Sequence, residues 1–200
     1  MFTVTFTYEN FANDRYAFAE RARVALQFVL AKPEFLQRVR DAKYTATLFD
    51  VPHGSQGPIG AAGVAPKILA GVGGGGSPSP DDPHTVALTL RLAYLEAGSD
   101  AATRAHSTLS QIEPSFVDDC MRRDDVGLLA AVLMHEWMHS LGFVHQDPRV
   151  VDRGDVPYAI EGIVVALGPA ARIPKQRLLE STIGVPWKHG LIADRLVHVR

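Results

Sequence analysis

One short stretch of the sequence carries most of its chemistry. His135 and His139 are four residues apart, and Glu136 directly follows the first of them. On a helix, residues at this spacing lie on one face, roughly 6 Å apart, so both imidazoles can reach one metal ion. Glu136 is rotated by about 100° from His135, which keeps its carboxylate outside the coordination sphere but within reach of a water molecule.

The residues that follow favour a third ligand. Gly142 allows a positive φ, the usual way to end a helix and turn the chain. Such a turn can bring His145 back toward His135 and His139. Three neutral histidines with one open position are typical of a catalytic zinc site, whereas histidines that only pack or cap a core helix need no such spacing. The spacing therefore predicts Zn²⁺ bound by His135, His139 and His145, with Glu136 as general base.

The pattern His135-Glu136-x-x-His139-x-x-Gly142-x-x-His145 resembles the long zinc-binding consensus of the metzincin metallopeptidases. The resemblance implies that the three histidines bind zinc, that Glu136 is general base and acid, and that the chain is a zinc endopeptidase acting on a peptide or protein substrate. It also implies an α+β fold: a mixed twisted sheet, a long backing helix, a central active-site helix and a small C-terminal subdomain. Residues 85–95 would form the edge strand that pairs with substrate.

The chain departs from the metzincin pattern in one respect. Metzincins have a methionine in a tight turn below the zinc, and this chain has none after Met138. The best positional candidate to replace it is Val156, in Asp155-Val156-Pro157-Tyr158, which follows His145 at a short distance like that in the matrixins. By the same resemblance, Tyr158 corresponds to a tyrosine that binds zinc or stabilises the transition state in some metzincins, so it is a candidate catalytic residue. The alternative is a helix-start aromatic packed in the core. No subfamily is assigned.

Four acidic residues downstream of the motif are weaker candidates. Glu161 is a possible third ligand of the gluzincin kind, although His145 explains the spacing better. Asp147, Asp152 and Asp155 either hold ligand imidazoles through hydrogen bonds or cap turns. The other histidines show no ligand spacing and are expected in loops or at the surface: His53, His84, His106, His189 and His198.

The elements that must position these residues follow from hydrophobic spacing. Residues 126–134 are apolar on every side, which indicates a central buried helix that continues into the histidines, capped by Asp124 or Asp125. A second helix is expected to begin at Asp155 and run over residues 156–167. Further helices are expected at 15–31, 33–40 and 115–123, and strands at 2–8, 44–49, 85–95 and 108–112.

Some boundaries rest on turn signals. Ser115 and Asp118 have the spacing of a capping box. Residues 54–83 look the least ordered, and the glycine-rich part at 71–80 is a flexible loop because no phosphate-binding motif follows it. A short helix near 175–180 and a strand near 191–199 are expected at the end. The predicted division is an N-terminal zincin-like subdomain at 1–145 and a C-terminal subdomain at 146–200.

Composition narrows the classes of function. A net charge of −2 over 200 residues, without a basic run, gives no basis for nucleic-acid binding. Cys120 is the single cysteine, which excludes intrachain disulfides and cysteine-based zinc sites, and a buried position without a role is expected. No secretion signal or membrane anchor is recognised, so a cytoplasmic location is the default and non-classical export is left open. Two alternatives to a peptidase remain: a zinc hydrolase of non-protein amides, and a zinc-binding interaction domain without catalysis.

Overall fold

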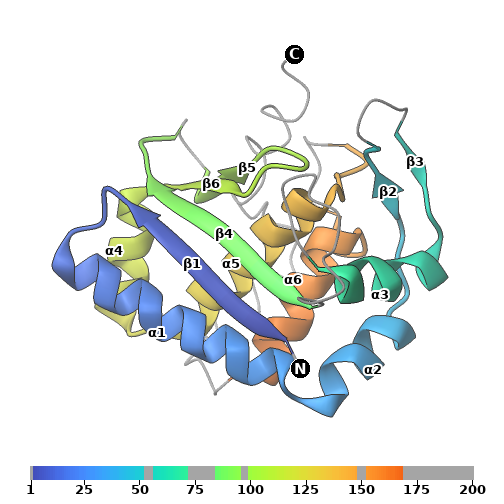
Figure 1. Cartoon of the computed structure of the whole chain (residues 1–200), viewed down its shortest axis with the longest axis horizontal. Coiled ribbons are helices and arrows are strands. Elements are labelled where there is room, and N and C mark those ends of the chain that lie inside the picture. Colours follow the sequence, from blue (N-terminus) through green and yellow to red (C-terminus); the bar gives the residue numbers. More distant parts are fainter. Residues whose placement is uncertain (1, 52–55, 72–83, 96–98, 148–151, 169–200) are drawn as a thin grey trace.

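Four strands, widely separated in the sequence, form one mixed sheet in the order β1-β4-β6-β5. The computed structural model describes residues 2–51, 56–71, 84–95, 99–147 and 152–168. The strands are β1 (Thr3–Glu9), β4 (Thr85–Leu92), β5 (Ala101–Thr103) and β6 (Leu109–Ile112). Strands β1, β4 and β6 are parallel, and β5 runs antiparallel to β6 at the edge (Figure 1).

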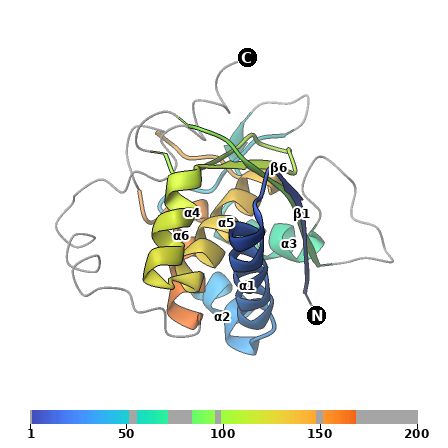
Figure 2. The same ribbon diagram turned by 90° about the vertical axis from the view of Figure 1, so that its left-hand side faces the viewer.

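Six helices and a two-stranded hairpin complete the part of the chain that the structure describes. The helices are α1 (Asn13–Leu30), α2 (Pro33–Asp41), α3 (Ala61–Ala70), α4 (Pro114–Arg123), α5 (Val126–Leu141) and α6 (Val156–Leu167). The hairpin pairs β2 (Leu48–Phe49) with β3 (Gly57–Pro58). Figure 2 shows α1, α4, α5 and α6 on the same side of the sheet. The predicted α+β class with a mixed sheet is confirmed.

The core lies between the sheet and α5. In β4, Val86, Leu88, Leu90 and Leu92 point inward and are at most 7% exposed, as expected for a strand with one buried face. Helix α5 is apolar all round and packs most extensively against α6 and α1, so nearly all of its residues are buried. Its two histidines are therefore held in the interior by the packing of the whole helix.

At the start of β1, backbone groups that do not pair with β4 are hydrogen-bonded to side chains of α1. The Gln27 amide accepts a hydrogen bond from the Val4 N–H (2.8 Å) and donates one to the Phe2 carbonyl. Arg23 donates to the Val4 carbonyl at 3.2 Å. These bonds occupy backbone groups that would otherwise be open to a further strand, so α1 blocks the start of this edge of the sheet.

Two predictions about strands were wrong. Residues 85–95 do not form an edge strand: β4 lies between β1 and β6, and β1 and β5 are the edges among the described strands. The strand expected at 44–49 shrinks to Leu48–Phe49, with isolated bridges from Ala46 to Asp155 and from Phe49 to Phe143. Both errors arise because strand neighbours are set by contacts far along the chain.

Two predictions about helices were also wrong. The stretch 54–83 contains β3 and α3; α3 forms despite Gly63 and Pro66 because Val64, Ala65 and Ile68 pack into the core. The capping box at Ser115 is absent. Helix α4 begins after Glu113 without a side-chain cap, and Asp118 binds Arg15 at 2.7 Å instead.

Several expectations concern residues outside the described part. They are most of the 71–80 loop, the helix near 175–180 and the strand near 191–199, and the subdomain division at 145 stays a prediction. Within the described residues, none of the helices has the length and apolar character needed to cross a membrane.

Candidate metal centre

Helix α5 brings His135, Glu136 and His139 into the interior. Asp125 caps the helix by accepting a hydrogen bond from the Leu128 N–H at 3.0 Å, as one of the two predicted caps. The side chains at the other end are almost completely buried: His135 is 1% exposed, Glu136 2% and His139 0%. Because polar groups are rarely buried without a compensating interaction, this helix end needs an explanation beyond packing.

The turn after α5 depends on Gly142. Its φ is +109°, and a Cβ at this position would lie 2.4 Å from Cε1 of His106 and 2.9 Å from the Asp50 carbonyl oxygen. The same turn is hydrogen-bonded to β2, since the Asp50 N–H donates to Gly142 (2.7 Å) and the Val144 N–H donates to Leu48 (3.2 Å). The glycine and the short strand together set the path that leads to His145.

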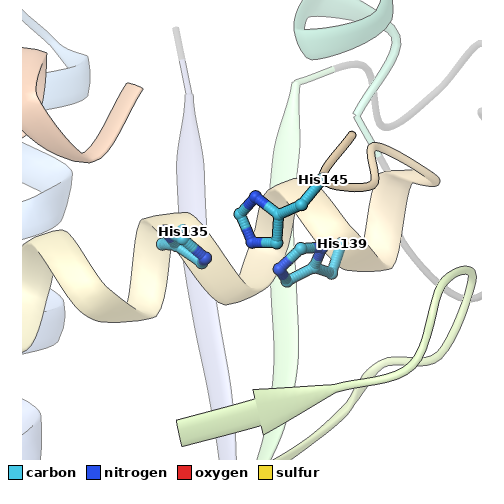
Figure 3. Close-up of side chains that lie close together, drawn as sticks. All are labelled: His135, His139 and His145. Carbon is cyan, nitrogen blue, oxygen red and sulfur yellow. The ribbon is translucent and has the colours of Figure 1, made fainter. Parts of the chain in front are cut away.

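The three histidines meet at one point. One ring nitrogen from each of His135, His139 and His145 lies within 4.8 Å of the other two, and all three residues are buried. Figure 3 shows the rings gathered on one side of α5, with His145 reaching back from the segment after the helix. The turn therefore brings His145 to His135 and His139, as the spacing predicts, and the three histidines could hold a metal ion.

The other nitrogen of each imidazole has a hydrogen-bond partner. His139 Nδ1 donates to the Phe143 carbonyl (2.8 Å), and His135 Nδ1 donates to Glu161 (2.9 Å). His145 Nδ1 donates to Asp155. A carbonyl oxygen only accepts, so the proton of His139 is on Nδ1 and its Nε2 carries a lone pair. That Nε2 is buried and has no hydrogen-bond partner among the described residues.

The electrostatics favour a cation at this point. Burial, with the nearby His145 and His135, holds the pKa of His139 well below its usual range, so its imidazole is neutral near pH 7. Burial also raises the pKa of the Asp155 carboxyl, while its bond to His145 acts in the opposite direction. Neutral imidazoles backed by carboxylates are the usual surroundings of a protein-bound metal ion.

The weaker candidates take different places. Glu161 lies behind His135, on the nitrogen opposite the meeting point, so the structure does not place it as a ligand. Asp155 caps α6 by accepting from the Tyr158 N–H at 3.2 Å and also holds His145. Asp152 accepts hydrogen bonds from Thr45 (2.6 Å) and from the Gly154 N–H (2.9 Å), which makes it a turn residue. Asp147, two residues after His145, is half-buried, and its role stays a prediction.

Tyr158 and Val156 differ in their relation to the histidines. The Tyr158 ring lies 4.6 Å from the ring of His135 and 4.8 Å from that of His145, measured between centroids. Val156 is buried in the hydrophobic core at the start of α6. The aromatic contact with the histidines thus comes from Tyr158. The resemblance to metzincins predicted a different role for this residue, in binding zinc or stabilising the transition state.

Sequence reasoning missed His106. Its Nε2 donates to the Asp50 carbonyl (2.6 Å), its backbone N–H donates to the His139 carbonyl (3.2 Å), and its ring packs on Phe49. It thereby supports the Gly142 turn without belonging to the metal group. No local spacing could have indicated this, because every partner is distant in sequence. Cys120 is buried, as expected, and His84 binds the Leu69 carbonyl. Three other histidines lie outside the described residues: His53, His189 and His198.

Comparison with known proteins finds no matching family model, no matching curated protein and no matching solved structure. The resemblance to metzincins therefore rests on the motif at residues 135–145.

Proposed function

We propose that His135, His139 and His145 bind one zinc ion and that the site hydrolyses peptide bonds. The observation that carries the metal site is the meeting of three buried imidazole nitrogens within 4.8 Å. The donor set fits zinc, which accepts neutral imidazole nitrogens and commonly takes three protein ligands in catalytic sites. His139 Nε2 is buried and has no hydrogen-bond partner in the described part of the chain, which supports the same fit, because a buried acceptor without a partner is costly unless something binds it.

Hydrolysis is the reaction that these residue types suit best. When bound, zinc supplies Lewis-acid chemistry that polarises a carbonyl group and activates water near neutral pH. Glu136 follows His135 on α5 and is 2% exposed. As general base it takes a proton from the attacking water, and as general acid it passes that proton to the leaving amine. The motif implies an endopeptidase, whose substrate would be an extended peptide.

Tyr158 is a proposed second participant. Its ring lies against His135 and His145, which places the side chain within the same cluster. Its hydroxyl is proposed to stabilise charge that develops on the substrate oxygen. Tyr158→Phe is then expected to lower kcat while the zinc content stays at one ion per chain.

A zinc-binding domain without catalysis is the second candidate. The observation that favours it is burial, since the three histidines are at most 2% exposed and Glu136 is equally enclosed. A structural zinc site has all coordination positions closed by the protein, whereas a catalytic one must admit substrate and water. Glu136 counts against this candidate, because a structural site needs no general base.

Metal content and turnover distinguish the candidates. We expect one zinc per chain by elemental analysis and cleavage within a diverse peptide library. Glu136→Gln should keep the zinc and lose turnover by a factor of about 10² or more, the usual size of a general-base contribution. Glu34→Gln, an exposed substitution at the start of α2, is the matched control and should change neither.

Each failure has its own meaning. Zinc binding with no cleavage of peptides or of a panel of non-protein amides supports the non-catalytic candidate. Cleavage of the amide panel alone supports a hydrolase with another substrate class. A chain that binds no divalent metal refutes the proposal, and so does a metal-loaded Glu136→Gln variant with full activity.

A further inference from the structure

Three residues at the start of α6, its N-cap included, contact the histidines at a regular spacing. Asp155, Tyr158 and Glu161 are three residues apart, so they follow one stripe along the first turns of the helix. All three are at most 9% exposed. The stripe lies against α5, the helix with which α6 packs most extensively.

Asp155 connects the start of α6 to one histidine. One carboxylate oxygen, Oδ1, accepts the Tyr158 N–H at 3.2 Å and caps the helix. The other, Oδ2, accepts the Nδ1–H of His145. Because one carboxylate makes both bonds, the orientation of the His145 ring is tied to the first turn of α6.

The Tyr158 ring contacts two of the imidazole rings, those of His135 and His145. It is stacked on His145, with 4.8 Å between centroids and 30° between planes. It meets His135 edge-on, at 4.6 Å and 70°. A rigid ring that touches both imidazoles restricts their tilt, which hydrogen bonds at Nδ1 alone do not.

Glu161 completes the arrangement one turn later. Its Oε2 accepts the Nδ1–H of His135 at 2.9 Å, from a carboxylate that is itself buried. His139 is held separately, by the Phe143 carbonyl within the Gly142 turn. The rings of His135 and His145 thus depend on α6, and that of His139 depends on the end of α5.

We propose that Asp155, Tyr158 and Glu161 form a positioning template that sets the orientation of His135 and His145 before metal binds, with the Tyr158 ring as its base. This inference rests on the proposed metal site. The template acts through the ligands, so the three residues are positioning residues in this role. Its physical benefit is preorganisation: rings already oriented lose less conformational freedom when the ion binds.

The first test measures metal affinity and the visible absorption of the Co²⁺-loaded protein. Tyr158→Leu removes the ring and should weaken zinc binding by about 10–100-fold, the range typical of residues that orient ligands, with an altered Co²⁺ spectrum. Tyr158→Phe keeps the ring and should restore both affinity and spectrum. Tyr16→Leu, on the exposed face of α1, is the matched control and should leave both unchanged.

The second test needs no metal. In the metal-free chain labelled with ¹⁵N at histidine, NMR should show His135 and His145 as Nδ1–H tautomers in the wild type. Glu161→Met should disturb that state for His135 only, and Asp155→Leu for His145 only, because neither new side chain offers an oxygen acceptor. Both variants leave the Tyr158 ring in place, so they report on the template even if Tyr158→Leu fails to fold.

The outcomes separate the two proposals. A wild-type chain that shows the tautomers but binds no metal refutes the proposed function and leaves the template standing. Unchanged affinity and Co²⁺ spectrum in folded Tyr158→Leu refute the template and leave the metal site standing. A Tyr158→Phe variant as weak as Tyr158→Leu also overturns the inference, because the hydroxyl would then be the part that matters. Unaltered tautomers in both carboxylate variants refute it as well.

Discussion

Replacing Gly142 by alanine tests how the third histidine is delivered. The residue has a φ of +109°, and its added Cβ would lie 2.4 Å from His106 Cε1 and 2.9 Å from the Asp50 carbonyl oxygen. The first contact is with a ring held by hydrogen bonds and packing, and the second is with backbone, so neither moves without cost.

The size of the effect follows from these two contributions. A non-glycine residue forced into this backbone region costs about 1–3 kcal/mol. Overpacking at a close contact adds about 1–3 kcal/mol. Gly142→Ala should therefore reduce the free energy of unfolding by about 4 kcal/mol, which lowers Tm by about 8–16 °C in a chain of this size. Because the turn leads to His145, zinc affinity should also fall by about 10-fold or more.

The matched control is Gly162→Ala. Gly162 lies inside α6, and a Cβ there would meet no heavy atom within 4 Å. The substitution should stabilise the chain by about 1 kcal/mol through helix propensity. Thermal unfolding and zinc titration of both variants give the comparison. A Gly142→Ala variant that matches the wild type in Tm and in zinc affinity would refute the account of the turn.

Three further predictions concern zinc binding, pH and the contact between α1 and the start of β1. Free zinc at about 100 times its Kd should raise the free energy of unfolding by about 2.7 kcal/mol, and a chelator should reverse this. Calorimetry that shows no stabilisation by zinc would contradict the proposed site. The metal-free protein should lose stability as pH falls below 6.5, because burial lowers the pKa of His139 and only the unfolded chain then takes up its proton; a flat profile from pH 7 to 5 in chemical denaturation would contradict this. Gln27→Leu should cost about 1–3 kcal/mol, because it removes the partners of the Val4 N–H and the Phe2 carbonyl, and a Tm equal to that of wild type would exclude that role.

Local patterns predicted the elements that carry the site. Apolar residues on every side of 126–134 indicated a buried helix, and α5 is that helix. Asp155 and Pro157 indicated the start of α6, and the structure places the N-cap at Asp155. The arrangement of His135, His139, Gly142 and His145 could be read from spacing because helix geometry and a glycine turn act within eleven residues.

The predictions that were wrong concern features that are set by contacts distant in sequence. The position of β4 inside the sheet is set by its pairing with β1 and β6, which no periodicity within 85–95 contains. Helix α3 includes a proline and forms because its apolar residues meet the core. His106 and Glu161 have roles fixed by partners 56 and 26 residues away, so their side chains carry no local signal.

The hydrogen bonds between α6 and α5 and the binding of a cation both lower the cost of burying carboxylates beside the histidines. Glu136, Asp155 and Glu161 are buried carboxyl groups: Glu136 follows His135 on α5, while Asp155 and Glu161 are hydrogen-bonded to His145 and His135. The third imidazole, that of His139, is neutral near pH 7. Hydrogen bonds from Nδ1 to Asp155 and Glu161 lower the cost of burying those two carboxylates but add no positive charge while the imidazoles stay neutral. Burial raises the pKa of Asp155, which is the sign expected where negative charge is poorly compensated. A divalent cation at the meeting point of His135, His139 and His145 would offset most of that charge. Metal binding should therefore stabilise the contact between the two helices, and denaturation of the metal-free chain should begin with the loss of α6 from α5.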